Sequence, residues 1–365
     1  MNNSFASVYK DKRVIVTGHT GFKGSWLTLW LQRLGAKVTG ISDRIPTTPS
    51  NFEASGLIDS VNDVRADLLD LEKIQQTFRE CRPHFVFHLA AQALVKESYD
   101  NPIRTFQTNA LGSVHLMEAL KGLEDPAVAV MITSDKVYDN VEWVWGYRET
   151  DALGGKDPYS ASKSMAEIAI KSYLKSLLHE KGTLKVGIGR AGNVIGGGDW
   201  AEARIVPDCV RAWSRGDSVS IRSPRATRPW QHVLEPLSGY LLLGKALAEE
   251  PNLHSEAFNF GPVAGQSKSV GDLILEMEKH WSNVRWEDLS AQGSPFLEAG
   301  LLKLNCDKAL YHLDWLPTLQ FEETVAMTVQ WYREFYEGGD MKSYSVNQID
   351  QYVHLARERG NGWAK

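Results

Sequence analysis

The stretch that decides the fold is RVIVTGHTGFKG, residues 13–24. Its first five residues are mostly β-branched and predict a short buried strand. Glycines follow at Gly18, Gly21 and Gly24, and apolar residues at helical spacing then run over 24–34. Glycines in such a turn let the backbone approach a pyrophosphate, which rests on the N-terminus of the following helix. The stretch therefore predicts the first unit of a dinucleotide-binding sheet, and a plain tight turn is the alternative.

The length and composition exclude several classes of protein. The chain has 365 residues, which corresponds to roughly two domains. Hydrophobic residues make up 43% and charged residues 23%, so a packed core is expected and disordered or fibrous classes are excluded. A formal net charge of −5 argues against a dedicated nucleic-acid-binding protein. Because no apolar run approaches the ~18 residues of a membrane span, we expect no contact with a membrane.

The cysteines and histidines indicate the compartment. Cys81, Cys209 and Cys306 are widely spaced and form no CxxC pair, which is typical of a reduced chain. Residues 1–12 lack the apolar segment of a signal peptide. The ten histidines show no zinc-like spacing beside cysteines. We therefore expect a cytoplasmic protein without a metal site.

Strand and helix signals alternate along residues 13–191. Strands are predicted over 13–18, 37–42, 64–68, 84–91, 127–134 and 184–191. Helices are predicted over 24–34, 70–81, 102–121 and 158–178. This alternation predicts an α/β protein with a doubly wound parallel sheet of the Rossmann type.

The alternation breaks after Asn193. We predict an NAD-binding domain over 1–195, to which 232–261 returns with a strand at 257–260 on the sheet edge. Residues 196–231 and 262–365 would form a smaller C-terminal substrate-binding cap. Such a cap would lie over the carboxyl ends of the strands, where ligands bind in these folds.

A dinucleotide should contact the glycine-rich turn and the ends of the following strands. Asp43 lies 25 residues after Gly18, at the usual offset of a carboxylate that binds the adenosine ribose. Arg44 could instead hold a 2′-phosphate, so these residues leave NAD and NADP open. His19 and Lys23 could touch phosphate or be solvated. The candidate cofactor-binding residues are Gly18, Thr20, Gly21, Phe22, Lys23, Gly24, Asp43, Arg44, Asp67, Leu68, Leu89, Ala90, Ala91, Tyr159 and Lys163.

A Tyr–Lys pair stands at the start of the predicted helix over 158–178. Tyr159 and Lys163 are four residues apart and therefore share one face of that helix. A lysine ammonium near a tyrosine lowers the pKa of the phenol and can anchor a ribose. The resulting tyrosinate can remove a proton from an alcohol while a hydride leaves the carbon.

A second group of polar residues follows the predicted strand over 127–134. Ser134 is placed to hydrogen-bond a reacting sugar oxygen. Asp135 and Lys136 form an adjacent acid and base pair. A capped or solvated loop is the structural alternative for this run.

Together these features resemble the extended short-chain dehydrogenase/reductase family. That family carries the T-G-x-x-G-x-x-G turn, a Ser or Thr after the fifth strand and the Y-x-x-x-K pair. Longer strings, which lie between about Lys12 and Tyr352, are similar to its nucleotide-sugar 4,6-dehydratases. They are residues 18–26, 133–138, 142–149, 190–200 and 228–236. The dehydratases of dTDP-glucose place Asp-Glu at the position of Asp135-Lys136. The Asp-Lys pair of this chain resembles the pattern of the CDP-glucose branch instead.

The resemblance implies a reaction and a role for each residue. CDP-D-glucose would lose water to give CDP-4-keto-6-deoxy-D-glucose, with transient reduction of NAD, in deoxysugar synthesis of the O-antigen type. Tyr159, Lys163 and Ser134 would act at C4. Lys136 would be the base at C5 and Asp135 the acid at C6. The diphosphate would be held by Asn193, Arg204 and Arg228, because Arg suits phosphate oxygens.

The resemblance also implies a homodimer or homotetramer. Relatives commonly pair through the helices that correspond to 102–121 and 158–178. Phe106, Leu116 and Leu120 are available for such an interface, but they could equally face the sheet.

Two other functions remain open. One is a dehydratase or epimerase for a dTDP-, GDP- or UDP-hexose, because a single sequence does not identify the residues that read the base. The other is a dinucleotide-binding protein without catalysis, which would typically lack the Tyr or the Lys of the pair.

Overall fold

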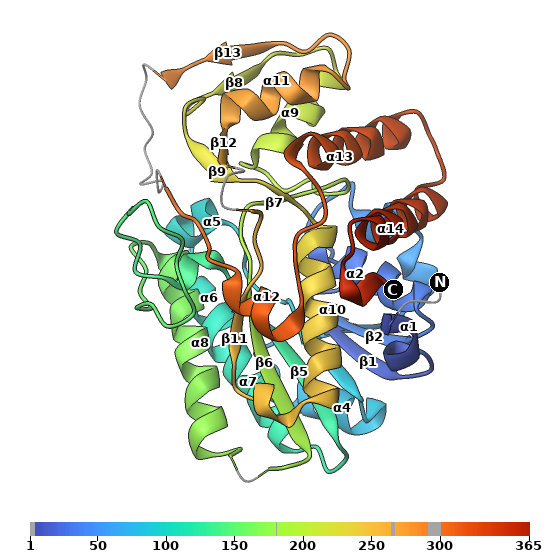
Figure 1. Cartoon of the computed structure of the whole chain (residues 1–365), viewed down its shortest axis with the longest axis vertical. Helices are drawn as coiled ribbons and strands as arrows, with labels where there is room; N and C mark the ends of the chain where they lie inside the picture. The colour runs from blue at the N-terminus through green and yellow to red at the C-terminus, as the bar shows by residue number, and fades with distance from the viewer. Residues whose placement is uncertain (1–3, 180, 264–266, 291–300) are drawn as a thin grey trace.

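The centre of the computed structural model is a seven-stranded parallel sheet (Figure 1). The structure describes residues 4–179, 181–263, 267–290 and 301–365. The strands are β1 (Arg13–Thr17), β2 (Lys37–Ser42), β3 (Asn62–Arg65), β4 (Phe85–His88), β5 (Ala127–Ile132), β6 (Leu184–Arg190) and β11 (Ala257–Asn259). Their spatial order is β11-β6-β5-β4-β1-β2-β3. The predicted doubly wound sheet is confirmed, and the strand expected at 257–260 pairs with β6 at the edge.

Helices cover both faces of this sheet. On one face lie α1 (Ser4–Tyr9), α2 (Phe22–Arg33) and α10 (Leu234–Glu249), and on the other lie α4 (Leu71–Cys81), α7 (Gly112–Lys121) and α8 (Pro158–Ser176). Side chains alternate along each strand. Val14 and Val16 therefore pack into the core on the face covered by α2 and α10, whereas Ile15 packs into the core on the face covered by α4 and α7. Burial on both faces explains why the central strands β4 and β5 are almost entirely apolar, whereas the edge strand β3 is polar and partly exposed.

The strand order reverses between β1 and β4. Ligands of such folds bind outside the carboxyl ends of the strands at this reversal. Beyond that edge lie α9 (Ile205–Trp213), α11 (Val270–Glu278), β8 (Val219–Ile221) and β13 (Trp286–Asp288) (Figure 1).

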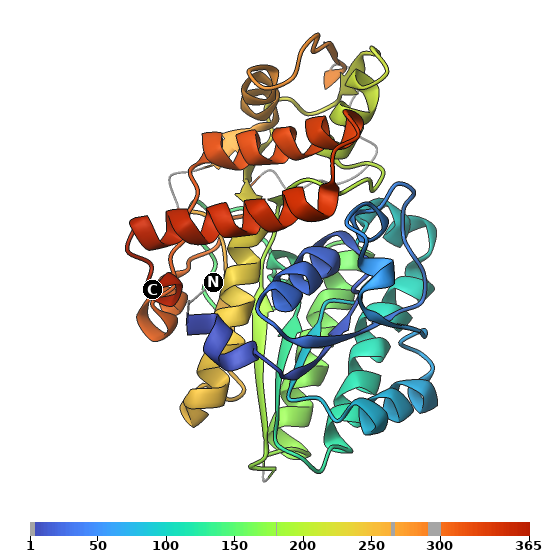
Figure 2. The same cartoon turned by 90° about the vertical axis from the view of Figure 1, so that its right-hand side faces the viewer.

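Two long helices complete the C-terminal part. Figure 2 shows α13 (Phe321–Tyr336) beside α14 (Met341–Glu358). The first also packs against α11 and the second against α2, so this part of the chain touches the sheet layer as well. The division into two domains stays a prediction.

The shorter elements connect these layers. They are α3 (Asn51–Ala54), α5 (Val95–Asp100), η3 (Asp135–Val137), β7 (Val194–Ile195), β9 (Thr227–Pro229), β10 (Gln231–His232), β12 (Ser267–Ser269) and α12 (Asp307–Leu313). No helix in the described ranges is long and apolar enough to cross a bilayer. The same ranges contain no group of three or more His, Cys, Asp or Glu side chains arranged to hold a metal ion.

Some predicted boundaries were wrong. The strand expected at 64–68 is β3 and begins two residues earlier, because Asn62 pairs with Thr39 of β2. It ends before Asp67, whose carboxylate accepts a hydrogen bond from the Leu69 N–H at 2.9 Å and turns the chain.

The predicted helix over 102–121 is interrupted. It consists of α6 (Pro102–Phe106), a π-helical turn η2 (Gln107–Leu111) and α7. In the π turn the Asn109 amide donates to Ser162 Oγ at 2.8 Å and accepts from the Gln92 N–H at 2.8 Å. Such turns inside helices are frequent at functional sites.

A buried carboxylate fastens the C-terminal helices to the sheet layer. Glu235, in the first turn of α10, is 1% exposed. It accepts hydrogen bonds from the Thr318 and Leu319 N–H groups and from the Tyr352 hydroxyl, at 2.6–2.9 Å. Burial raises the pKa of Glu235 to about 7, although these donors oppose the shift.

This carboxyl group should make stability depend on pH. Its pKa rises from 4.5 in the unfolded chain to about 7, so the folded protein binds the extra proton between these values. The free energy of unfolding should therefore fall by up to about 3 kcal/mol as pH rises through this window. Urea unfolding at several pH values measures this change in the free energy of unfolding. Glu235→Gln should remove this component and the exposed control Glu256→Gln should retain it, whereas identical pH profiles would contradict the assignment.

Candidate active site

The glycine-rich turn lies against the carboxyl end of β4. Gly18 has φ +74°, and an added Cβ would lie 2.7 Å from the Ala90 nitrogen. At Gly24 an added Cβ would lie 2.0 Å from the Gly18 carbonyl oxygen. Gly21 is the N-cap residue of α2. Its backbone is extended, and it has no side chain to bond the first N–H groups of the helix. The turn thus presents backbone to the crevice, as a pyrophosphate requires.

The remaining cofactor candidates lie around this turn. Thr20 Oγ1 donates to the Arg44 carbonyl at 2.7 Å, which ties the turn to the end of β2, where Asp43 and Arg44 are exposed. Leu89, Ala90 and Ala91 follow β4, and the Ala90 N–H donates to Thr17 Oγ1 at 3.2 Å.

Asp67 and Leu68 follow β3 beside α6 and α7. The Asp67 carboxylate pairs with the Arg104 guanidinium at 2.5 Å. The Leu68 side chain is buried against Gly112, and its carbonyl oxygen is 2.9 Å from His115 Nδ1. Contact of either residue with an adenine stays a prediction.

The expectation that His19 could be solvated was wrong. Its imidazole is fully buried over Gly40, where an added Cβ would lie 2.2 Å from the ring. Its Nε2 is 3.0 Å from Asp63 Oδ1 and its Nδ1 is 3.1 Å from Ser42 Oγ. The His19 side chain therefore joins the glycine-rich turn to β2 and β3, with both ring nitrogens engaged within the protein.

The predicted catalytic residues converge at the carboxyl ends of β5 and β6. Ser134 Oγ donates to Asp135 Oδ1 at 3.0 Å and accepts from the Lys136 N–H at 3.2 Å. The Lys136 ammonium lies 5.8 Å from the centre of the Tyr159 ring. Tyr159 and Lys163 are both less than 10% exposed at the start of α8, which Asp157 caps through the Ser160 N–H. The structure thus brings all five residues together, with Lys136 half-buried and the other four buried.

Burial dominates the electrostatics of this cluster. It raises the pKa of Tyr159 to about 12, and the hydrogen bond with Ser134 opposes the shift. It lowers the pKa of Lys163 to about 8, with a further contribution from the Lys23 ammonium. Burial also lowers the pKa of Lys23 to about 8, against the attraction of Asp135. Lys23 thus belongs electrostatically to the reacting end of the crevice.

The three predicted substrate-binding residues follow β6 in the chain: Asn193 in a loop, Arg204 at the start of α9 and Arg228 in β9. Asn193 follows β6 at φ +48°, next to Gly192, which packs against the Asp135 carboxylate. Arg204 Nη1 contacts Asp199 Oδ2 at 2.7 Å, and its charge acts on Tyr159. Arg228 lies in β9, where its Nη1 donates to the Thr227 carbonyl at 2.9 Å. Their roles toward a diphosphate stay predictions.

Comparison with known proteins adds the family. The model of the GDP-mannose 4,6-dehydratase family matches residues 15–328. The chain belongs to this family. CDP-glucose 4,6-dehydratase of Salmonella typhimurium is 44% identical over 349 residues, which cover 94% of this chain and 97% of that protein. The predicted resemblance to nucleotide-sugar dehydratases is confirmed.

More distant members share the fold. The dTDP-glucose 4,6-dehydratase of Streptomyces antibioticus is 26% identical to this chain. The match covers 88% of this chain and 92% of that protein. A UDP-glucose 4-epimerase of Thermus thermophilus, solved in complex with NAD, has a TM-score of 0.73 at 26% identity. The match covers 88% of this chain and 99% of that structure.

Sequence reasoning missed a buried histidine in this family member. His88, at the end of β4, is 3% exposed; its Nδ1 is 2.7 Å from Thr17 Oγ1 and its Nε2 is 3.2 Å from Ser113 Oγ. The Ser113 hydroxyl donates to the Asn109 carbonyl at 2.6 Å. This chain of bonds joins the glycine-rich turn to the π turn, and Asn109 joins that turn to α8 through Ser162. The sequence feature that could have indicated this role is a histidine at the end of an apolar strand.

A buried ion pair was also missed. Arg190 of β6 and Glu167 of α8 contact one another and are fully buried. Glu167 also accepts from the Thr133 hydroxyl at 3.0 Å, and Arg190 donates to the Tyr138 hydroxyl at 2.6 Å. The pair therefore holds both ends of the segment 133–138 that carries the candidate acid and base. A charged residue ending an apolar strand was again the signal.

Proposed function

We propose that the chain is an NAD-dependent CDP-D-glucose 4,6-dehydratase, a hydro-lyase that yields CDP-4-keto-6-deoxy-D-glucose and water. The observation that carries this proposal is the cluster of Ser134, Asp135, Lys136, Tyr159 and Lys163 beside the glycine-rich turn, in which Lys136 is half-buried and the other four are buried. The 44% identity to a CDP-glucose 4,6-dehydratase over nearly the whole chain supports the choice of sugar nucleotide.

The residues present fit NAD. The backbone of Gly18, Gly21 and Gly24 offers the pyrophosphate cradle, and Asp43 at the end of β2 suits the ribose hydroxyls. NAD held there would supply the hydride chemistry of the reaction, which is oxidation at C4 and reduction at C6 of the same sugar. Lys163, one turn after Tyr159 on the inner face of α8, would hold the nicotinamide ribose.

The first protein step is removal of the C4 hydroxyl proton. Tyr159 takes this proton, while the Ser134 hydroxyl holds the sugar O4. Because burial is the main cause of a Tyr159 pKa of about 12, the ionised phenol requires nearby cations. The Arg204 guanidinium favours the ionised phenol, and the Lys163 ammonium, one turn later on α8, would supply a second cation.

The second step is the loss of water. The ketone at C4 acidifies the C5–H bond, and Lys136 in its unprotonated form takes that proton. Asp135 gives a proton to the C6 hydroxyl, which leaves as water. As the C6 carbon is reduced, Lys136 returns a proton to C5. Tyr159 then holds one proton more and Asp135 one proton fewer than at the start, and transfer of that proton from Tyr159 to Asp135 restores the site.

The function is tested with a panel of nucleotide sugars. CDP-, dTDP-, GDP- and UDP-glucose are each incubated with the protein and NAD, and the 4-keto product is followed by its absorbance in alkali. We expect CDP-D-glucose to give the fastest turnover and Tyr159→Phe to lose a factor of about 10² or more. Faster turnover of another nucleotide sugar would assign that substrate instead. NAD binding without turnover of any would indicate a dinucleotide-binding protein.

We also propose that the protein is a cytoplasmic homodimer in deoxysugar synthesis of the lipopolysaccharide O-antigen type. Leu116 and Leu120 are fully buried against the sheet, so they do not form the dimer face. On the neighbouring helices α6 and α8, however, Ile103 is 74% exposed and Ile168 is 56% exposed. Apolar side chains this exposed on adjacent helices favour an interface with a second copy.

A single charge should break this dimer. Ile168→Glu places a carboxylate in the proposed interface, and we expect it to sediment as a monomer in analytical ultracentrifugation. Ile58→Glu, at a site that is 51% exposed on η1 (Leu57–Asp59), should sediment like the wild type. A monomeric wild type, or a dimeric Ile168→Glu variant, would contradict the proposed interface.

A further inference from the structure

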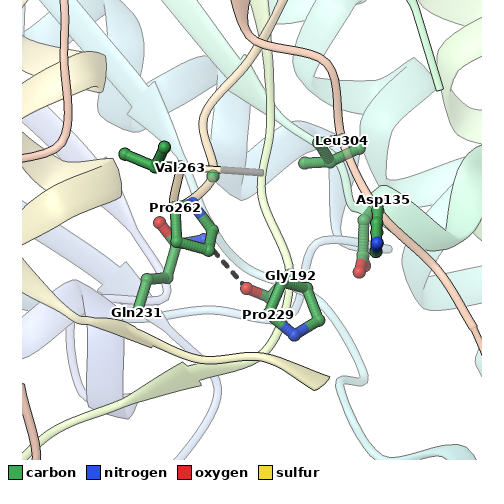
Figure 3. A pocket seen from close by; sticks show the side chains of 9 residues that line it. Asp135, Gly192, Pro229, Gln231, Pro262, Val263 and Leu304 are labelled. Carbon is green, nitrogen blue, oxygen red and sulfur yellow. Dashed lines mark hydrogen bonds between the residues drawn. The ribbon is translucent and has the colours of Figure 1, made fainter. Parts of the chain in front are cut away.

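The segment between β6 and α9 borders the reacting end of the crevice. It begins near Gly192, which lines a pocket together with Asp135 (Figure 3). Further along, Gly196 packs against the first turn of α2, where an added Cβ would lie 3.2 Å from the Phe22 ring. The segment therefore runs from the candidate acid to the helix turn that carries Lys23.

This segment carries a buried carboxylate that sequence reasoning did not single out. Asp199 is 6% exposed. Its backbone N–H donates to the Tyr332 hydroxyl of α13 at 3.1 Å, and the same hydroxyl donates to its carbonyl oxygen. Its Oδ1 accepts a hydrogen bond from the Ala201 N–H at 3.1 Å. The backbone and one carboxylate oxygen of Asp199 are thus held by neutral groups.

The other oxygen of this carboxylate contacts a cation. Asp199 Oδ2 lies 2.7 Å from Arg204 Nη1, and in the part of the chain that the structure describes Arg204 is its one ionic partner. A buried carboxylate is costly unless it is paired, so this contact explains how Asp199 can be buried. Arg204 is the N-cap residue of α9, and its side chain makes no capping bond to that helix. Asp199 therefore fixes the position of the guanidinium.

The Arg204 guanidinium acts on the reacting residues. Burial raises the pKa of Tyr159 to about 12, and the Arg204 charge opposes this shift. Burial lowers the pKa of Lys23 to about 8, and the Arg204 charge adds to this shift. A guanidinium has five N–H donors, and within the described ranges only Nη1 has a hydrogen-bond partner. The charge of Arg204 is thus available to groups in the crevice.

Groups of both signs surround the Tyr159 phenol. The charged and titratable groups that face it are Asp135, Lys136, Asp157, Lys163, Arg204 and Tyr240. The two carboxylates raise the pKa of the phenol, and Arg204 lowers it. Burial lowers the pKa of Lys163 to about 8, so its charge fades in weakly alkaline solution. A guanidinium stays charged at every pH at which proteins are folded, so Arg204 is the permanent cation beside the phenol.

We propose that Asp199 is a positioning residue for the oxidation at C4, because it holds the Arg204 guanidinium beside the phenol of Tyr159. There the permanent positive charge favours the tyrosinate that takes the C4 hydroxyl proton. The role in oxidation rests on the proposed function, whereas the placement of Arg204 by Asp199 does not. Tyr332 extends the arrangement to α13, so a C-terminal helix helps to set the charge at the reacting tyrosine.

Crystal structures of the wild type and of Asp199→Asn, both with NAD, test the placement alone. Asn keeps the bond from the Ala201 N–H and turns its NH₂ group toward Arg204 Nη1, so two donors face one another and the guanidinium is released. We expect Arg204 beside the Tyr159 phenol in the wild type and displaced in the variant. An Arg204 that keeps its place in the variant, or that lies away from Tyr159 in the wild type, would overturn the proposal. Neither result depends on which sugar nucleotide is turned over, so failure here is distinct from failure of the proposed function.

The pH dependence of oxidation tests the role in the reaction. Single-turnover oxidation is followed by the fluorescence of the reduced cofactor, with the sugar nucleotide that the panel shows to be turned over fastest. In Asp199→Asn we expect the rise of the oxidation rate with pH to move about one unit higher, because the phenol loses a nearby positive charge. Oxidation near neutral pH should then slow roughly tenfold at unchanged KM, and the slowing should diminish at higher pH. Equal slowing at every pH, or a raised KM with an unmoved pH profile, would refute the role.

A double variant shows whether Asp199 acts through Arg204. Arg204→Gln should give the same shift of the pH profile, and adding Asp199→Asn to it should change nothing further. Additional slowing in the double variant would contradict the proposal. Asp208→Asn is the matched control, because it alters a carboxylate 3.0 Å from Arg211 Nη1 in the same helix, and it should keep the wild-type profile. If Asp199→Asn does not fold, the place of Arg204 in the wild-type structure and the pH profile of Arg204→Gln decide.

Discussion

Gly18 approaches Ala90 so closely that an added Cβ would lie 2.7 Å from the Ala90 nitrogen, and the rest of the active site depends on this contact. It sets the start of α2 against the end of β4 at the reversal of the strand order. From there, Thr17, His88 and Ser113 carry hydrogen bonds to the π turn, and Asn109 carries them to α8. The position of Tyr159 and Lys163 is thus fixed relative to the turn that would hold the pyrophosphate.

The second constraint is the burial of charge. Tyr159, Lys163 and Lys23 are all shifted toward their neutral forms, so the site needs its cations close to the phenol before that phenol can act as a base. The buried pair of Arg190 and Glu167 is part of the same arrangement, because it holds the segment that carries Asp135 and Lys136. Removing one member of such a pair would leave an uncompensated charge in the core.

Much of this could be predicted from the sequence, because the signals are local. Apolar strand runs, the glycine spacing and the four-residue interval between Tyr159 and Lys163 follow from geometry within one or two elements. Contacts between distant segments could not be predicted. The burial of His19 over Gly40 depends on β2 and β3, and the π turn at Asn109 depends on Gln92 and Ser162. Whether Leu116 faces the sheet or a partner was open for the same reason.

The central claim is that these residues move the protons of an internal redox reaction, in which the hydride that leaves C4 of the sugar is the one that reaches C6. The most direct test follows deuterium from C4 of labelled CDP-D-glucose through a single turnover. We predict that the label appears at C6 of the 4-keto-6-deoxy product. Loss of the label to solvent would contradict the account.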